Sequence, residues 1–477
     1  MGNGDQRIDL DDIQGNILRG YAMGSVRHLV VTVSDVAAAR RFLGELASGG
    51  SGPQLTSAAP WGEKPRTCLN VGATFTGLRA LGVPKASLDS FPGEFREGAV
   101  GRAAKVGDIG ASEPAKWRQN MGDPDKVHLM WSAYGTTPAD RDELSDQLER
   151  NLTERGAFIV TARFDGESLP NDEVHFGYRD GISQPRFKVN GEFIGRTDGQ
   201  PVAPVGSVLL GYESSFPGLR WNVPEPSSLG FNGTFNAFRV LEQDVDAFED
   251  LLRTTAAEHH VDPEWVAAKL MGRWRNGVPL TMSPAQPMEI TPEIEDNLND
   301  FDYLQVNDHP YPDDYAGTVC PVGSHIRRTN PRGSRIMQRT ANHTRRLVRR
   351  SIPYGKRYDP ARPRDGVARG LLGCFMCSSL LSQFEAIMYD WINLGLQDPR
   401  ITGTNDVIIG ANTLRASRFE IPVDEDPLHN LVVSRFSRLT ETIAAAYYFV
   451  PSLSAVRHLA GLGEADSSSP TSHAPTR

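Results

Sequence analysis

One carboxylate, Asp180, lies in a segment whose composition suits proton transfer. The segment is VHFGYRDGISQP, residues 174–185. Gly177 and Gly181 allow positive φ angles and close approach of another group to the backbone, and Pro185 fixes the exit. Its apolar neighbours predict that the turn packs against an apolar surface, where a carboxylate can act as a proton acceptor. The alternative is an ordinary Asp-Gly turn whose carboxylate accepts hydrogen bonds from its own backbone.

A histidine, His325, stands in a second segment that is suited to hold a cofactor. The segment is CPVGSHIRRTNPR, residues 320–332, with a proline near each end and three arginines after the histidine. Arginine is a poor neighbour for a bare cation, but its guanidinium pairs well with the carboxylates of an anionic cofactor. Haem meets both conditions, because its iron takes a histidine ligand and its propionates pair with arginine. The alternative is a structural histidine in an ordered loop.

A third segment, TRRLVRRSIPYG at residues 344–355, carries two pairs of arginines. On a strand, Arg345 and Arg349 share one face, and Arg346 and Arg350 share the other. If either face is covered, its guanidinium groups need a carboxylate or a cofactor beside them. The alternative is a solvated edge strand that its charges protect from pairing.

The composition is that of a soluble globular protein, with 39% hydrophobic and 23% charged residues in 477 positions. The net charge of −9 argues against a general nucleic-acid-binding protein and against docking on an anionic membrane. No apolar run is long enough to span a membrane. The start of the chain, MGNGDQR, has neither an apolar region nor a twin-arginine pair, so we expect no export signal and a cytoplasmic location.

The four cysteines do not indicate a disulfide framework in a chain of this length. Cys374 and Cys377 form a CxxC pair, which in other contexts marks a redox or metal site. However, the run LLGCFMC, residues 371–377, predicts a buried strand, on which residues three apart face opposite sides. We therefore expect the pair to be structural.

The first half of the chain predicts alternating strands and helices around these segments. The predicted strands span 26–33, 67–71, 127–134 and 158–164, and the predicted helices lie within 8–21, 36–47, 75–81 and 138–151. With antiparallel pairing, this order is close to a ferredoxin-like sandwich with one extra helix. The stretch 84–124 has little periodicity, and a loop of that length predicts a rim around a cofactor or substrate.

The second half repeats this pattern coarsely. Its predicted strands span 208–212, 233–241, 345–352, 370–378 and 442–450, and its predicted helices span 243–258, 263–274, 380–394 and 453–459. The halves are of roughly equal size, which predicts two domains.

Four segments, taken in order, resemble those of the dye-decolorizing peroxidases. GYRDG at 177–181 matches the GxxDG motif of that family, and DIQGNILRGY at 12–21 resembles its N-terminal signature. GSHIRRTNPR at 323–332 resembles the proximal-histidine segment, and RRSIPYG at 349–355 resembles the distal-arginine segment. Together these matches are specific, and the later segment 371–384 is also similar. The length and the absence of an export signal resemble the longer, leaderless branch of the family.

The resemblance implies an α+β fold of two tandem ferredoxin-like domains, antiparallel sheets with helices, with haem held mainly by the C-terminal domain. We place the N-terminal domain at 1–200, the C-terminal haem-binding domain at 201–462 and a disordered tail at 463–477. It also implies a peroxidase that carries haem b (iron protoporphyrin IX). Such an enzyme reduces hydrogen peroxide and oxidises dyes, phenolics or other organic reductants by single-electron steps.

By the same resemblance, His325 is the fifth ligand of the haem iron, and Asp180 and Arg349 lie over its open face. Asp180 takes a proton from hydrogen peroxide and returns it to the leaving oxygen, so it must be ionised. Arg349 lowers the pKa of this carboxyl and stabilises the negative charge that develops on the peroxide. We therefore expect activity that favours acidic pH.

Four further residues are expected around the cofactor. Arg327 would pair with a propionate, and Leu372 and Phe375 would line the pocket over the open face, with core packing as the alternative. Glu385 would accept a hydrogen bond from His325 and so tune the iron.

Large dyes cannot enter a pocket sized for peroxide, so their oxidation requires an aromatic relay to the surface. Tyr354, Tyr389 and Trp391 are the candidates, and core packing is again the alternative. The acidic stretch 289–314 could hold a cation such as manganese, although a solvated loop is its ordinary role.

Two other functions fit parts of the sequence. A haem-handling protein without turnover would need His325 but neither Asp180 nor Arg349. A haem-free ferredoxin-like binding protein would need none of the three and would show no Soret band.

Overall fold

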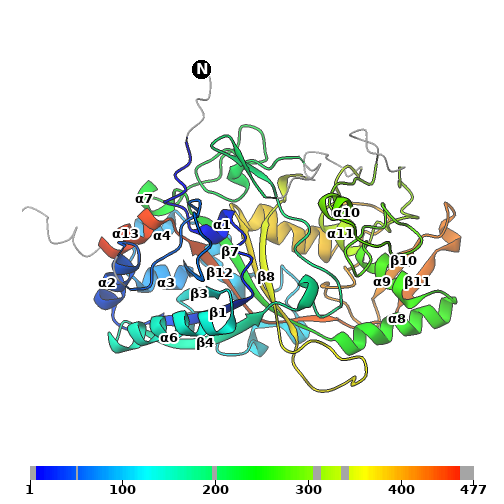
Figure 1. Ribbon diagram of the computed structural model, residues 1–477, viewed down its shortest axis with the longest axis horizontal. Helices are drawn as coiled ribbons and strands as arrows, with labels where there is room; N and C mark the ends of the chain where they lie inside the picture. Colours follow the sequence, from blue (N-terminus) through cyan, green and yellow to red (C-terminus); the bar gives the residue numbers. More distant parts are fainter. Residues whose placement is uncertain (1–6, 50–51, 196–200, 305–312, 335–342, 462–477) are drawn as a thin grey trace, which may run out of the picture.

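The centre of the molecule is one antiparallel sheet of eight strands, which runs through both halves of the chain (Figure 1). A computed structural model describes residues 7–49, 52–195, 201–304, 313–334 and 343–461. The order across the sheet is β4-β1-β3-β2-β12-β7-β9-β8. The strands are β1 (Ser25–Val33), β2 (Thr67–Ala73), β3 (Leu129–Gly135), β4 (Phe158–Glu167), β7 (Thr234–Gln243), β8 (Val348–Tyr354), β9 (Gly370–Cys377) and β12 (Thr440–Val450).

The two halves of the sheet have the same topology. In chain order, each half places its fourth strand first, then its first, third and second. A single residue pair, Phe449 with Ala73, joins β12 to β2 and makes the sheet continuous. The fold is therefore α+β and consists of two ferredoxin-like units, as the sequence and the resemblance predict. Two short hairpins lie outside this sheet, β5 (Phe187–Val189) with β6 (Glu192–Ile194) and β10 (Arg418–Ile421) with β11 (Leu431–Ser434).

Helices begin where the sequence supplies caps. The Asp35 side chain accepts a hydrogen bond from the first turn of α2 (Val36–Leu46), and Thr137 forms a capping box with Asp140 at the start of α6 (Pro138–Glu154). The other helices are α1 (Gly15–Leu18), α3 (Phe75–Ala80), α4 (Lys85–Asp89), α5 (Gly93–Arg102), α7 (Ser227–Gly230), α8 (Val245–His259), α9 (Pro263–Met271), α10 (Pro292–Asn297), α11 (His325–Thr329) and α13 (Leu453–Gly461).

The stretch 84–124 crosses from the first half onto the second. Phe95, in α5, packs against Phe235 of β7 with ring centroids 5.2 Å apart, and Phe91 packs edge-on against Phe449 of β12 at 5.3 Å. These fully buried rings tie the two halves into one hydrophobic core. The stretch also supplies residues 106–108 to the wall of the main cavity, in agreement with the predicted rim.

Most predicted elements are confirmed, and five need correction. The stretch 84–124, predicted as a long loop, contains the helices α4 and α5. Residues 208–212 are turns and bends rather than a strand, although Leu209 and Leu210 are buried. The predicted helix at 380–394 consists of two π-helical turns, Leu380–Glu385 and Ile387–Ile392. The strand expected from residue 345 begins only at Val348, and the opening helix is limited to α1. The predicted tail at 463–477 lies outside the described residues.

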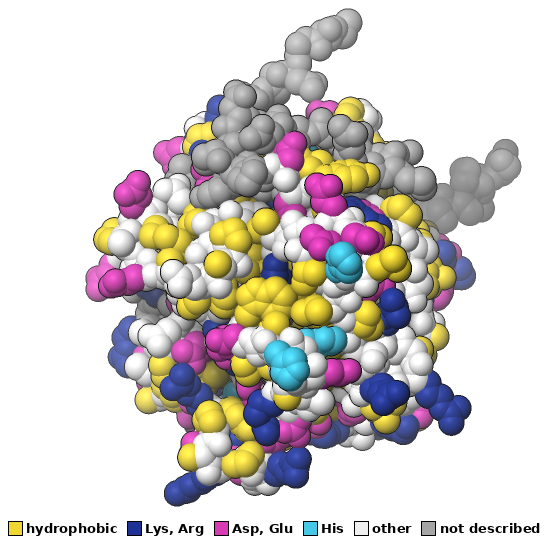
Figure 2. Space-filling view, turned by 90° about the vertical axis from the view of Figure 1, so that its right-hand side faces the viewer, with side chains coloured by type: hydrophobic (Ala, Val, Ile, Leu, Met, Phe, Trp, Pro, Cys, Tyr) yellow, Lys and Arg dark blue, Asp and Glu magenta, His cyan; other side chains and the backbone are white. Residues whose placement is uncertain are grey.

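Acidic and basic side chains are interspersed on the face at the α8 and β11 end of the molecule, around a central group of apolar side chains (Figure 2). In the described part of the chain, no helix has the length and apolar character needed to cross a membrane.

Candidate active site

Asp180 lies in an irregular turn that its neighbouring glycines permit. Gly177 and Gly181 have φ angles of 82° and 77°. A Cβ on Gly177 would overlap the guanidinium of Arg275, which donates a 2.7 Å hydrogen bond to the carbonyl oxygen of Phe176. Both glycines are therefore favoured by their positive φ angles, as the sequence predicts, whereas a Cβ on Gly181 would meet nothing within 4 Å.

Arg349 projects from the edge strand β8 toward this turn. Its Nη2 lies 3.2 Å from Oδ1 of Asp180 and donates to the carbonyl oxygen of Ser183 at 3.2 Å. Gln184 fastens the turn to the strand, because its amide accepts from the N–H of Arg349 (3.2 Å) and donates to the carbonyl of Arg349 (2.9 Å). The role of Gln184 was not predicted, since an isolated glutamine in a loop carries no sequence signal.

The electrostatic surroundings keep Asp180 ionised. Burial by itself would raise the pKa of this carboxyl, but the positive charge of Arg349 and the N–H of Gly181 hold the pKa below its ordinary value. The side chain remains 33% exposed. Asp180 can therefore accept a proton at acidic pH.

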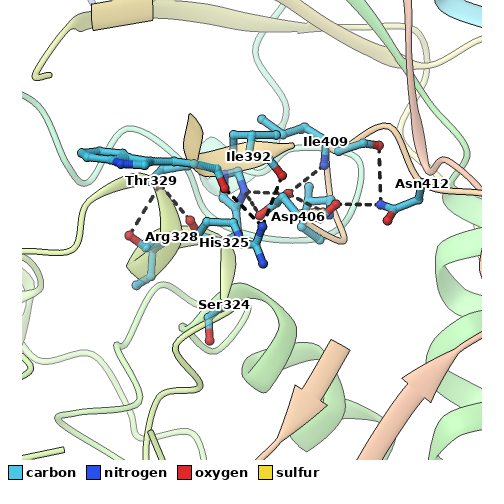
Figure 3. A network of polar contacts seen from close by, with 12 residues as sticks. Ser324, His325, Arg328, Thr329, Ile392, Asp406, Ile409 and Asn412 are labelled. Atoms are coloured by element: carbon cyan, nitrogen blue, oxygen red, sulfur yellow. Dashed lines mark hydrogen bonds and ion pairs between the residues drawn. The ribbon is translucent and has the colours of Figure 1, made fainter. Parts of the chain in front are cut away.

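His325 opens α11 and is held from behind by a carboxylate (Figure 3). Its Nδ1 lies 3.1 and 3.2 Å from the two carboxylate oxygens of Asp406. The side chain of Asp406 is fully buried and also accepts hydrogen bonds of 2.9 Å from the N–H groups of Ile408 and Ile409. These bonds fix the orientation of the imidazole and leave its Nε2 with no hydrogen bond from any residue that the structure describes.

The electrostatics of Asp406 match this role. Burial would raise the pKa of its carboxyl, but His325 and the surrounding donors hold the pKa below its ordinary value. Glu385 was predicted to occupy this position, and that prediction is wrong. Glu385 is fully buried elsewhere, where it accepts hydrogen bonds from Arg102 (2.9 and 2.5 Å) and from the hydroxyl of Tyr447 (3.1 Å).

The two arginines after His325 hold its helix in place. Arg328 is 1% exposed and donates to the carbonyl oxygens of Ile392 (3.2 Å) and Thr404 (2.8 Å). Arg327 was predicted to pair with a propionate, but it points away from the cavity. It donates instead to the carboxylate of Asp314 (2.9 Å) and is 3% exposed.

A cavity of about 330 Å³ brings the three predicted groups together, since His325, Asp180 and Arg349 all line it. Its floor is one face of the C-terminal half of the sheet. Alternate residues of four strands contribute to that face, in keeping with the two-residue period of a strand. They are Arg349 and Ser351 of β8, Leu371 and Phe375 of β9, Arg239, Leu241 and Gln243 of β7, and Thr440 and Thr442 of β12.

The predicted pocket residues on β9 are correct in one case and wrong in the other. Phe375 lines the cavity, and its ring folds over Gly373, where a Cβ would lie 2.7 Å from the ring. Leu372 is three residues away and so faces the opposite side, where it is 1% exposed in the core. Leu371 is the leucine on the cavity face.

A second cavity, of about 670 Å³, reaches Asp180 and Arg349 from the side of the N-terminal half. Residues of the N-terminal signature line it, and Nε of Arg350 donates to the carbonyl of Asn16 at 2.8 Å. The signature at 12–21 therefore lies close to the candidate site in space although it is distant in sequence.

The residues present fit haem. The imidazole of His325 is oriented by Asp406, which is the arrangement that a metal-ligating histidine takes in proteins. Its cavity has apolar walls that suit a porphyrin, and guanidinium groups that suit anionic propionates. The apolar side chains include Met271, Ile326, Leu347, Phe384, Ile387, Met388 and Ile408, and the arginines include Arg332, Arg345 and Arg346.

The aromatic residues proposed as a relay differ in exposure. Trp391 lines the cavity, is 3% exposed and lies under the guanidinium of Arg345 at 4.6 Å. Tyr389, two residues earlier, is 43% exposed, and Tyr354 is half-buried on β8. The acidic stretch 289–314 falls partly outside the described residues, and among those that are described no cluster of His, Cys, Asp and Glu could hold a metal ion.

Comparison with known proteins finds peroxidases both among the sequence relatives and among the solved structures. No family model matches the chain. A dye-decolorizing peroxidase of Mycena epipterygia is 30% identical over 493 residues, which cover 96% of this chain and 88% of that protein. A multifunctional dye peroxidase of Amycolatopsis sp. is 29% identical, with 96% and 97% covered. A solved dye-decolorizing peroxidase in complex with 2,6-dimethoxyphenol superimposes with a TM-score of 0.76 at 26% identity, covering 95% of this chain and all of that one.

Proposed function

The chain belongs to the dye-decolorizing peroxidase family and is a peroxidase, and from this premise we propose that Asp180, Arg349 and His325 are its catalytic centre. The proposal further names haem b as the cofactor and hydrogen peroxide as the oxidant. The observation that carries it is the ionised Asp180–Arg349 pair on the wall of the cavity that also contains His325. The cytoplasmic location remains a prediction.

His325 would hold the haem iron through Nε2, since Asp406 occupies Nδ1. Among the arginines that line the cavity, the half-buried Arg345 and Arg346 could meet the propionates, whereas Arg332 is 3% exposed and already donates to the carbonyl oxygens of Asn299 and Phe301. When bound, haem supplies a redox-active iron at which the O–O bond of hydrogen peroxide is cleaved.

The chain's own groups move the proton and stabilise the charge. An Asp180 carboxylate oxygen accepts a proton from hydrogen peroxide and gives it to the oxygen that leaves as water. Arg349, 3.2 Å from that carboxylate, stabilises the negative charge that develops during cleavage. Gln184 positions Arg349 through its two backbone hydrogen bonds.

Phenolic compounds and dyes are the proposed reductants. The structural relative that was solved with 2,6-dimethoxyphenol supports the phenolic class. For dyes too large for the cavity, the exposed Tyr389 and the cavity-lining Trp391, two residues apart in sequence, are the proposed relay.

Asp180→Asn tests the proposal. We expect kcat/KM for peroxide to fall roughly 100- to 10,000-fold, because the amide cannot accept the proton, while the Soret band is retained. Asp89→Asn is the matched control, since Asp89 is an exposed aspartate that lines neither cavity.

A haem-handling protein without turnover is the alternative that this experiment separates. Undiminished peroxide-dependent oxidation by Asp180→Asn with haem bound would disprove the catalytic role. Haem binding without any peroxide turnover in the wild-type protein would favour haem handling.

A further inference from the structure

A buried pair of side chains, Glu385 and Tyr447, has no part in the reaction assigned above. The hydroxyl of Tyr447 donates a hydrogen bond to Oε1 of Glu385 at 3.1 Å. Glu385 is 0% exposed and Tyr447 is 3% exposed. Neither side chain lines the cavity that contains His325. The two residues therefore form a separate unit in the protein interior, a phenol that donates its hydrogen bond to a carboxylate.

Arg102 of α5 supplies the counter-charge for this carboxylate. Its Nε and Nη2 atoms donate to the two carboxylate oxygens of Glu385 at 2.9 and 2.5 Å. A bidentate pair of this kind fixes the carboxylate in one orientation. Arg102 also pairs with Glu97 at 3.2 Å, so its charge does not depend on Glu385 alone. The carboxylate is thus held rigidly against the hydroxyl of Tyr447.

The sheet places Tyr447 close to the cavity. Tyr447 on β12 pairs with Ala237 of β7, which pairs in turn with Phe375 of β9. Phe375 pairs with Arg349, so all four residues share one face of the sheet, and three strand spacings of about 14 Å in total separate the backbones of Tyr447 and Arg349. The Phe384 ring lies 5.6 Å from that of Phe375 and 6.1 Å from that of Tyr447. Since Phe384 lines the cavity, one aromatic ring separates the phenol from it.

This position suits a tyrosine that gives up an electron. Burial and the negative charge of Glu385 raise the pKa of the Tyr447 hydroxyl well above its ordinary value, so the resting phenol keeps its proton. A phenol that has lost an electron is a strong acid, and its proton must pass to a base within hydrogen-bond reach. Burial keeps bulk water away from the pair, and Glu385 is the base that the hydroxyl already contacts.

We propose that Tyr447 is a redox-active residue that reduces peroxide-oxidised haem by one electron. The electron passes from the phenol to the haem, the O–H bond breaks, the proton moves to Oε1 of Glu385, and a neutral tyrosyl radical remains. An electron from a later reductant and the proton from Glu385 restore Tyr447. The pair therefore stores one oxidising equivalent inside the protein, unlike a surface relay for dyes. The inference rests on the proposed function for the haem and its oxidation by peroxide.

Electron paramagnetic resonance of haem-loaded protein, frozen shortly after mixing with hydrogen peroxide, tests this role. We expect the earliest radical signal to narrow when the protein is produced with ring-deuterated tyrosine, and Tyr447→Phe should remove that signal. Tyr448→Phe is the matched control and should keep it. Tyr448 is the next residue of β12 and is 0% exposed, but its hydroxyl has no hydrogen-bond partner in the part of the chain that the structure describes.

Glu385→Gln tests the base. The amide can accept a hydrogen bond but not the proton, so the signal should form roughly 100-fold more slowly. A purely structural role of Glu385 would not slow it. An unchanged signal in Tyr447→Phe protein, or an unchanged rate in Glu385→Gln protein, would overturn the inference. Tyr447→Phe removes only one hydroxyl, so it keeps the inference testable if Glu385→Gln does not fold.

Zinc porphyrin in place of haem separates this inference from the proposed function. Light and a soluble electron acceptor oxidise the zinc porphyrin without peroxide, and Tyr447 should then reduce it and give the same radical signal. Protein whose haem is oxidised by peroxide, but which forms no radical on Tyr447, would refute the inference alone. Protein that does not react with peroxide, but forms the Tyr447 radical under light, would refute only the proposed reaction with peroxide.

Discussion

Replacing Asp406 by asparagine isolates the negative charge behind the His325 imidazole. The carboxylate is fully buried, and its oxygens lie 3.1 and 3.2 Å from Nδ1. The amide keeps the size of the side chain and one acceptor oxygen but removes the charge. We expect the reduction potential of bound haem to rise, because an imidazole without a carboxylate partner is a weaker electron donor to iron.

The magnitude follows from the strength of this hydrogen bond. A hydrogen bond to a charged group contributes about 1.5–3 kcal/mol, and a neutral one is roughly half as strong. The bond is present in both oxidation states, so this difference of about 0.75–1.5 kcal/mol is the upper limit of the preference for the oxidised iron that the substitution removes. Since 59 mV corresponds to about 1.4 kcal/mol for one electron, the potential should rise by up to about 30–65 mV.

Spectroelectrochemical titration of haem-loaded wild-type and Asp406→Asn protein measures this shift. Asp398→Asn is the control, because Asp398 is also buried but pairs with Arg400 at 2.6 Å outside the cavity. Its potential should equal that of the wild type. An unchanged potential in Asp406→Asn protein that keeps its Soret band would refute the reasoning, since the imidazole would then not depend on this carboxylate.

The remaining predictions concern the open side of the cavity and the two faces of β9. Because Arg349 lowers the pKa of Asp180 and the base acts only when ionised, kcat/KM should persist at acidic pH and fall only as the pH drops below the ordinary range of an aspartate. A pH profile of the wild type with an acid limb near neutrality would contradict this, and Arg349→Leu should move the limb to higher pH. Leu372→Ala should cost about 2–5 kcal/mol of unfolding free energy in chemical denaturation without shifting the Soret band, because its side chain is in the core. Leu371→Ala should shift the band at a smaller cost in stability, and the reverse pattern would show that the faces of β9 are misassigned. Gln184→Leu should lower kcat/KM by roughly 10- to 100-fold in steady-state assays, because it removes both bonds that position Arg349, and wild-type kinetics in this variant would exclude that role.

The sequence by itself determined the local features of the site. Glycines on both sides of Asp180 require the irregular turn, and the structure has positive φ at both. Apolar and β-branched runs predicted most strands, and the 3.6-residue period predicted most helices. Both predictions work because the period of apolar residues shows which face of an element is buried. The sequence also identified His325, which lies between two prolines and is followed by three arginines, and Arg349, which lies in a segment with two pairs of arginines. Both side chains line the cavity.

Tertiary structure alone decided what lies opposite each of these groups. Asp406 is 81 residues from His325 and reaches it only because the segment after Ile392 folds back beneath α11. Glu385 is closer in sequence, but its helical turn faces Arg102 from the other half. The strand at 370–377 was predicted correctly, yet its period gives two equivalent faces, and only packing against the N-terminal half shows that Leu371, not Leu372, meets the cavity. Contacts between distant segments depend on how whole elements pack, which no single stretch of sequence records.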